Sequence, residues 1–197
     1  LQNWQDLPRP LIAVVVGGAK FPIRMGASDL RRLAAEANGL ARERKGSLVI
    51  ILSPRTNARH AQAMLQEFDV PYRFYPWGPG KPNPYQAALG LADEFVVTSE
   101  SASMISEAVY SGKPVNIFEL PQFPLFLSWS AKYGLGAVAA RRGWLQPPRN
   151  IRRISRQLIR KKIVTQLGEK PRVRPYFLSN EDIVVNKLKS MLATAVE

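Results

Sequence analysis

Three short polar segments of the sequence carry residue types that bind phosphate groups. Gly17-Gly18 permits close approach of a backbone to an anion, and Ser53 with Arg55 offers a hydroxyl and a guanidinium. The third segment is a cluster of hydroxyl side chains: Thr98, Ser99, Ser101 and Ser103. Simpler interpretations are a glycine turn, a capped helix beside a solvated arginine, and ordinary helix capping by one or two of the hydroxyls. Together the segments predict a site for a diphosphate.

Glu107 stands one turn into the helix that follows this hydroxyl cluster. A carboxylate at that position can accept hydrogen bonds from the two hydroxyl groups of a ribose. The alternative interpretation is an acid on the helix surface, and the residues alone favour it.

The sequence lacks the motifs of metal-dependent and triad chemistry. It has no cysteine and one histidine, His60, and it contains neither D-x-D nor H-E-x-x-H. We therefore predict that the ligand binds without a metal or another cofactor. A Ser-His-Asp hydrolase is disfavoured too, because nothing marks a nucleophile elbow. No catalytic residue is assigned.

The elements that must position these residues alternate along the chain. Short apolar runs predict strands at 11–16, 48–52, 72–75, 94–98 and 115–118. Apolar residues at helical spacing predict helices at 28–45, 57–68, 85–91 and 103–110, the first capped by Ser28. This alternation predicts an α/β fold, a doubly wound (Rossmann-like) parallel sheet with helices on both faces. Each polar segment directly follows a strand, so the three should lie at the carboxyl edge of the sheet.

The C-terminal part of the chain is strongly basic. Residues 141–174 hold twelve Lys or Arg side chains against one acid, Glu169, which gives +11 of the +13 carried by the whole chain. We predict basic C-terminal helices, one over about 150–166 and a last one capped by Ser179 or Asn180. The first fits a packed helix with a solvated basic face, or a surface for an anionic membrane. Nucleic acid is disfavoured as a partner, because the tract lacks interleaved aromatic residues.

Length and composition favour one domain. With 197 residues, 46% of them apolar, we predict an α/β core over about 10–145 and a basic helical extension over about 146–197. The start at Leu1 predicts a fragment that lacks an N-terminal partner domain. The absence of cysteine and of a long apolar run predicts a cytoplasmic protein, and the basic extension permits a peripheral position at the inner membrane face.

Several motifs together resemble a known family. The runs ADEFVVTSES (92–101), SMISEA (103–108) and GKPV (112–115) resemble the bacterial branch of the mitochondrial fission Elm-type family. Gly17-Gly18, SPRT (53–56) and NPY (83–85) follow the order of that family, so the resemblance covers about 10–144. Two positions depart from it: Pro54 stands where a second basic residue is expected, and Glu100 where Asp is expected.

The resemblance implies a fold and a function, because that family is similar to GT-B glycosyltransferases. It implies a GT-B C-terminal domain, the half that binds a nucleotide-diphosphate sugar. It would place Ser101, Ala102 and Ser103 at the diphosphate, Glu107 at the ribose and Gly17-Gly18 at the interdomain cleft. The implied reaction is metal-independent glycosyl transfer, with the acceptor and the general base supplied by the missing domain. The alternative is a non-catalytic scaffold module that docks through its basic segment to a membrane or a protein.

Overall fold

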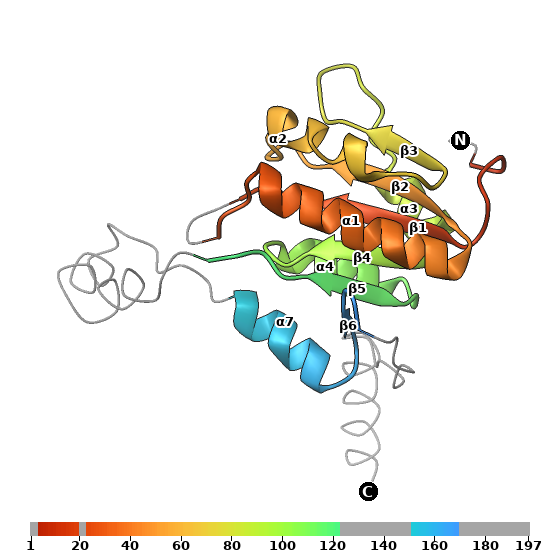
Figure 1. Cartoon of the computed structure of the whole chain (residues 1–197). Coiled ribbons are helices and arrows are strands. Elements are labelled where there is room, and N and C mark those ends of the chain that lie inside the picture. Colours follow the sequence, from red (N-terminus) through yellow and green to blue (C-terminus); the bar gives the residue numbers. More distant parts are fainter. Residues whose placement is uncertain (1–3, 20–22, 123–150, 170–197) are drawn as a thin grey trace, which may run out of the picture.

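The computed structural model describes residues 4–19, 23–122 and 151–169, and within them strands and helices alternate (Figure 1). The strands are β1 (Leu11–Val16), β2 (Ser47–Leu52), β3 (Tyr72–Tyr75), β4 (Glu94–Thr98), β5 (Val115–Phe118) and β6 (Thr165–Gln166). The helices are α1 (Ala27–Arg44), α2 (Ala58–Gln62), the 3-10 turn η1 (Leu65–Glu67), α3 (Tyr85–Leu91), α4 (Ala102–Tyr110) and α7 (Ile151–Arg160).

The six strands form one parallel sheet in the order β3-β2-β1-β4-β5-β6. The chain moves outward from β1 to β3, then returns to place β4 against the other side of β1. The strand order therefore reverses between β1 and β4. In sheets of this kind ligands bind at such a switch point, outside the carboxyl ends of the strands.

Apolar side chains alternate between the two faces of the sheet, and each face is covered by helices (Figure 1). Ile12, Val14 and Val16 of β1 pack with α1, whereas its other residues pack with α3 and α4. Both faces of β1 are thus buried, as its uninterrupted apolar run predicts. The predicted doubly wound, Rossmann-like α/β fold is confirmed.

Two predicted helix boundaries on the α1 side of the sheet are wrong. Helix α1 begins at Ala27 with Gly26 as N-cap in place of Ser28, because the Asp29 carboxylate accepts a 2.8 Å hydrogen bond from the Gly26 amide. The helix predicted over 57–68 is broken into α2 and η1. The amides of Ala63 and Met64 bond to carbonyls three residues earlier, which tightens the chain into 3-10 geometry.

The basic helix predicted over 150–166 is shorter than expected. Helix α7 ends at Arg160, Lys162 adopts a left-handed conformation, and the Ile163 amide bonds back to the Leu158 carbonyl. This is a Schellman termination, and the chain that leaves it pairs with β5 as the unpredicted strand β6. The predicted last helix and residues 146–150 lie outside the described residues. Among the helices that are described, none is long and apolar enough to cross a bilayer.

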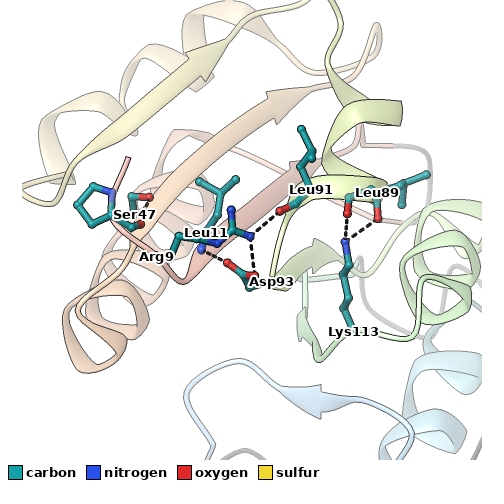
Figure 2. A network of polar contacts seen from close by, with 9 residues as sticks. Arg9, Leu11, Ser47, Leu89, Leu91, Asp93 and Lys113 are labelled. Carbon is teal, nitrogen blue, oxygen red and sulfur yellow. Dashed lines mark hydrogen bonds and ion pairs between the residues drawn. The ribbon is translucent and has the colours of Figure 1, made fainter. Parts of the chain in front are cut away.

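Polar side chains fasten the amino edge of the sheet, the edge opposite the predicted site (Figure 2). The Asp93 carboxylate accepts 2.6 Å hydrogen bonds from both the Arg9 guanidinium and the Leu11 amide. Arg9 also donates to the Leu91 carbonyl, and the Lys113 ammonium donates to the carbonyls of Leu89 and Gly90. These bonds join the starts of β1, β4 and β5 to the end of α3.

Candidate functional site

The structure brings the three predicted polar segments together at the carboxyl ends of β2, β1 and β4. The Thr56 hydroxyl donates to the Gly17 carbonyl at 2.8 Å, which ties the turn after β2 to the turn after β1. The Gly17 amide in turn donates to the Thr98 hydroxyl at 2.9 Å, which ties β1 to β4. Residues far apart in sequence thus meet at the topological switch point.

Gly17 and Gly18 are required by close approach, because each faces atoms where a side chain would lie. A Cβ on Gly17 would stand 1.5 Å from Oε1 of Glu100. A Cβ on Gly18 would stand 2.1 Å from the Arg55 Cβ and 2.4 Å from its carbonyl oxygen. Both glycines are buried, and they let the turns after β2 and β4 close over the end of β1.

The turn after β2 is a compact set of hydroxyl contacts that holds Arg55 outward. The Ser53 amide donates to the Thr56 hydroxyl at 3.0 Å, and the Thr56 amide donates to the Ser53 carbonyl at 3.0 Å. The Arg55 amide donates to the Ser53 hydroxyl at 3.3 Å. The Arg55 side chain is exposed. The turn therefore presents a guanidinium to solvent from a fixed backbone.

The four hydroxyls around the start of α4 have different surroundings. Thr98 and Ser99 are buried, and the Ser99 hydroxyl accepts a hydrogen bond from the Leu120 amide at 3.1 Å. Ser101 is the N-cap of α4 and accepts from the Met104 amide at 3.4 Å. Ser103 is exposed. The first amides of α4 and Ser103 are thus the groups placed to meet an anion, while Thr98 and Ser99 hold the loop.

Glu107 is exposed one turn into α4, and Tyr85 at the start of α3 lies beside it. Burial, followed by the nearby Glu107 carboxylate, raises the pKa of Tyr85. The Tyr85 hydroxyl oxygen is buried and forms no well-aligned hydrogen bond within the part of the chain that the structure describes. The exposed carboxylate of Glu107 thus lies next to the buried hydroxyl group of Tyr85.

Glu100 lies in the loop between β4 and α4, and only 6% of its surface is exposed. Its Oε1 accepts a 3.0 Å hydrogen bond from the Thr98 hydroxyl. Its Oε2 has no hydrogen-bond partner among the described residues. Burial raises the pKa of Glu100, while a backbone hydrogen bond at Glu100 itself, the hydrogen bond from Thr98 and the charge of Arg55 act in the opposite direction.

No role was predicted from the sequence for Thr56, Tyr85 or Glu100. Thr56 could have been found from its spacing to Ser53, since a hydroxyl three residues on can close a turn. Glu100 stands among hydroxyl residues at the end of a strand, and this local pattern could have indicated a site residue. Its burial depends on the missing side chain of Gly17, which the local pattern does not reveal. Tyr85 and Glu107 lie on different helices, so no local sequence pattern predicts their contact.

A cavity of about 440 Å³ lies apart from these residues, between α1 and the β5–β6 side of the sheet. Arg32, Glu36, Phe118 and Glu169 are among its lining residues. The Arg32 guanidinium stacks 4.2 Å from the Phe118 ring centroid and donates to the Glu119 carbonyl. Within the described residues no three His, Asp or Glu side chains converge on a possible metal position.

Comparison with known proteins gives one family. The family model described as mitochondrial fission ELM1 matches residues 1–135. The mitochondrial fission protein ELM1 of Arabidopsis thaliana is 38% identical over 119 residues, which cover 58% of this chain and 27% of that protein. The chain thus spans about a quarter of the length of this curated relative.

Three solved structures show weaker similarity. A universal stress protein from Archaeoglobus fulgidus is 15% identical, with a TM-score of 0.35 over 60% of this chain and 98% of that one. The FMN binding protein AtHal3 is 9% identical, with a TM-score of 0.37 over 94% and 98% of the two chains. A ugt transferase from Siraitia grosvenorii in complex with UDP is 17% identical, with a TM-score of 0.31 over 68% and 32%.

Proposed function

The chain belongs to the mitochondrial fission ELM1 family, and we propose that it is the donor-binding half of a GT-B-type, glycosyltransferase-like protein. The ligand is a nucleotide-diphosphate sugar, bound at the carboxyl edge of the sheet without a metal. The acceptor and the general base belong to a partner domain N-terminal to this chain. The chain by itself therefore binds the donor and does not transfer the sugar.

The observation that carries this proposal is the convergence of the three polar segments at the switch point between β1 and β4. Arg55 is exposed there beside the glycine turn, and α4 begins there with a serine cap. A guanidinium and the positive end of a helix dipole both favour phosphate. Glu107 stands one turn farther along α4, on the exposed side of the helix.

Each group has a definite task in the proposed reaction. Negative charge grows on the diphosphate as the bond to the sugar breaks, and Arg55 with the first amides of α4 stabilises that charge. The carboxylate of Glu107 accepts hydrogen bonds from the ribose hydroxyls and fixes the nucleoside. Thr56, Thr98 and Ser99 hold the loops and make no contact with the ligand.

Calorimetric titration of the chain with UDP, GDP, CDP and ADP tests the proposal. We expect one nucleotide to bind selectively, and Arg55→Ala and Glu107→Ala each to weaken its affinity about tenfold to a hundredfold, because hydrogen bonds to charged groups contribute about 1.5–3 kcal/mol. Arg160→Ala and Glu43→Ala are matched controls, since both side chains are exposed and lie on other elements.

Two outcomes contradict the donor site. One is a folded protein that binds none of the nucleotides even when the partner domain is supplied. The other is selective binding that Arg55→Ala and Glu107→Ala leave at the wild-type affinity, which would place the nucleotide elsewhere on the molecule.

A second candidate function, docking to an anionic membrane, has one specific observation in its favour. Helix α7 packs Leu158 and Ile159 toward the core. Its outward side chains and those just after it are basic and exposed: Arg156, Arg160, Lys161 and Lys162. Ile154 beside them is 43% exposed. A basic face that also presents an apolar side chain matches an anionic lipid surface.

Co-sedimentation with phosphatidylserine vesicles distinguishes this candidate. Docking predicts binding that neutral phosphatidylcholine vesicles do not give and that Arg160→Glu with Lys161→Glu removes. Equal recovery of the wild type and the double variant with both kinds of vesicle would contradict it, and salt-dependent retention on DNA would point to nucleic acid instead.

A further inference from the structure

Glu100 is the buried acid of the loop between β4 and α4, and one of its two carboxyl oxygens is unpaired among the described residues. Oε1 accepts from the Thr98 hydroxyl at 3.0 Å, whereas Oε2 is buried without a partner among the residues described. A buried carboxyl oxygen without a partner costs free energy, so a native structure that retains one calls for an explanation. The segment that holds it leads directly into the N-terminus of α4.

The carboxyl group takes its place against the end of β1 because Gly17 has no side chain. Oε1 stands 1.5 Å from where a Cβ would be, so the acid covers the glycine turn directly. The Gly17 amide bonds to Thr98 at the end of β4, and the loop that carries Glu100 runs from Thr98 to the N-terminus of α4, where the proposed phosphate would lie. A ligand at this position and the Glu100 carboxyl group therefore have to accommodate one another.

Among the described residues, Arg55 is the charged group whose field reaches Glu100. Arg55, on the turn after β2, is close enough for its positive charge to lower the pKa of Glu100, although the two form no ion pair. From β1 and β4 the groups that face Glu100 are Gly17 and Thr98, and neither is charged. A phosphate that draws Arg55 to itself removes this positive charge and brings negative charge beside the carboxyl group.

We propose that the diphosphate binds at the N-terminus of α4 together with one proton, which Glu100 takes up from solvent so that its Oε2 donates a hydrogen bond to a phosphate oxygen. The inference rests on the proposed donor site and adds to it a contact and a dependence on pH. When it is ionised, Oε2 can only accept a hydrogen bond, and no described residue donates one to it. When it is protonated, Oε2 can donate a hydrogen bond to the phosphate oxygen. The same protonation removes the repulsion between a carboxylate and a phosphate. Glu100 thus makes the site selective for ligands that bring an acceptor to this atom.

Titration calorimetry in buffers of different ionisation enthalpy measures the proton directly. The probes are UDP-glucose, GDP-mannose and ADP-glucose, because their diesterified diphosphates lack the terminal phosphate ionisation, whose pKa is about 6. Any proton taken up near neutral pH then belongs to the protein. The affinity is measured across about pH 5 to 9, the range in which a carboxyl group with a raised pKa titrates.

Glu100→Gln is the informative variant, because it keeps the size of the side chain over Gly17 and carries no titrating group. The expected wild-type result is uptake of up to one proton and an affinity that falls about tenfold per pH unit above the pKa of the free protein. In Glu100→Gln both the proton uptake and the pH dependence disappear. Glu43→Gln, on the exposed surface of α1, keeps the wild-type profile.

Binding of a nucleotide sugar with no proton uptake by the wild type overturns the inference and leaves the donor site in place. Equal uptake by the wild type and Glu100→Gln overturns it as well, since the proton then enters another group. The wild-type measurement stands by itself if Glu100→Gln fails to fold. Absence of binding for all probes, at every pH and with the partner domain supplied, contradicts the proposed donor site and this inference together.

Discussion

The two edges of the sheet use acidic side chains in opposite ways. At the amino edge, both oxygens of Asp93 accept hydrogen bonds, from Arg9 and from the Leu11 amide, each at 2.6 Å (Figure 2). At the carboxyl edge, one oxygen of Glu100 has no partner among the described residues. Asp93 is partly exposed, with 36% of its side-chain surface in contact with solvent, whereas Glu100 is 6% exposed.

The contrast separates an acid that fastens the fold from the acid that we propose contacts a ligand. A partly exposed acid would be hydrated without protein partners, yet Asp93 is fully paired and fastens β1 to β4. The buried acid, for which a missing partner is far more costly, is the one left incomplete. Such an arrangement suits a binding site, because a ligand gains the most binding free energy from unpaired polar groups that a rigid structure already holds in position.

Gly18→Ala should have the largest effect on this contrast, because the added methyl group meets the backbone of Arg55 at 2.4 Å. We expect a loss of about 2–3 kcal/mol in the free energy of unfolding, typical of an overpacked site, together with loss of nucleotide binding as Arg55 is displaced. Urea unfolding measures the first and calorimetry the second.

Gly39→Ala is the matched control for that substitution. Gly39 is exposed within α1, and a Cβ there meets no atom within 4 Å. The added methyl group should stabilise the helix by about 0.5–1 kcal/mol and leave binding unchanged. If both alanine variants changed stability equally, the close approach at the carboxyl edge would not be a feature of the protein in solution.

Asp93→Asn should destabilise the protein by about 1–2 kcal/mol at neutral pH without weakening nucleotide binding, because it removes charged hydrogen bonds at the amino edge. Burial opposes the shift, but the bonds from Arg9 and Leu11 lower the pKa of Asp93 below its ordinary value of 3.8. This contribution to stability is present above pH 3.8 and is lost as the pH falls through the lowered pKa. The difference between wild type and variant should therefore shrink in acid.

Denaturant unfolding at a series of pH values checks this prediction. A difference that stays constant down to the acid unfolding of the protein would mean that Asp93 contributes through packing and not through its charge. A variant that binds nucleotide less tightly while remaining folded would contradict the division of tasks between the two edges.

The smallest effects should come from a pair of serines at the carboxyl edge. Ser99→Ala removes the acceptor of the Leu120 amide and should cost about 1 kcal/mol of stability, with little change in affinity. Ser103→Ala changes an exposed hydroxyl and should leave stability within about 0.5 kcal/mol while weakening binding a few-fold. The opposite assignment, with Ser99 affecting affinity and Ser103 affecting stability, would show that the ligand enters from another direction.

The sequence predicted the fold well where the signal is local. Val14 and Val16 sit in a continuous apolar run that only a buried strand explains, and the spacing of Ile105, Ala108 and Val109 marks α4. It failed where tertiary contacts decide. Strand β6 is two residues long and forms because the edge of β5 is otherwise unpaired, so no sequence pattern predicts it.

The candidate site was predictable as a set of segments and not as a set of contacts. Strand ends carrying Gly17, Arg55 and Ser101 indicate a shared edge of the sheet, and the structure places them there. The separate tasks of Ser99 and Ser103 depend on which hydroxyl meets the Leu120 amide, a contact across the sheet. The burial of Glu100 depends on the missing side chain of Gly17, which lies far away in the sequence.

Amide chemical shifts of the isotope-labelled chain, followed while the nucleotide that binds is added, locate the binding site directly. We expect the largest shifts on Gly17, Gly18, Ala102 and Ser103 at the carboxyl edge, while the amide shifts of Leu11, Asp93 and Lys113 at the amino edge stay unchanged. Shifts concentrated at the amino edge, or on the cavity between α1 and β5–β6 with the carboxyl edge unchanged, would contradict the proposed donor site.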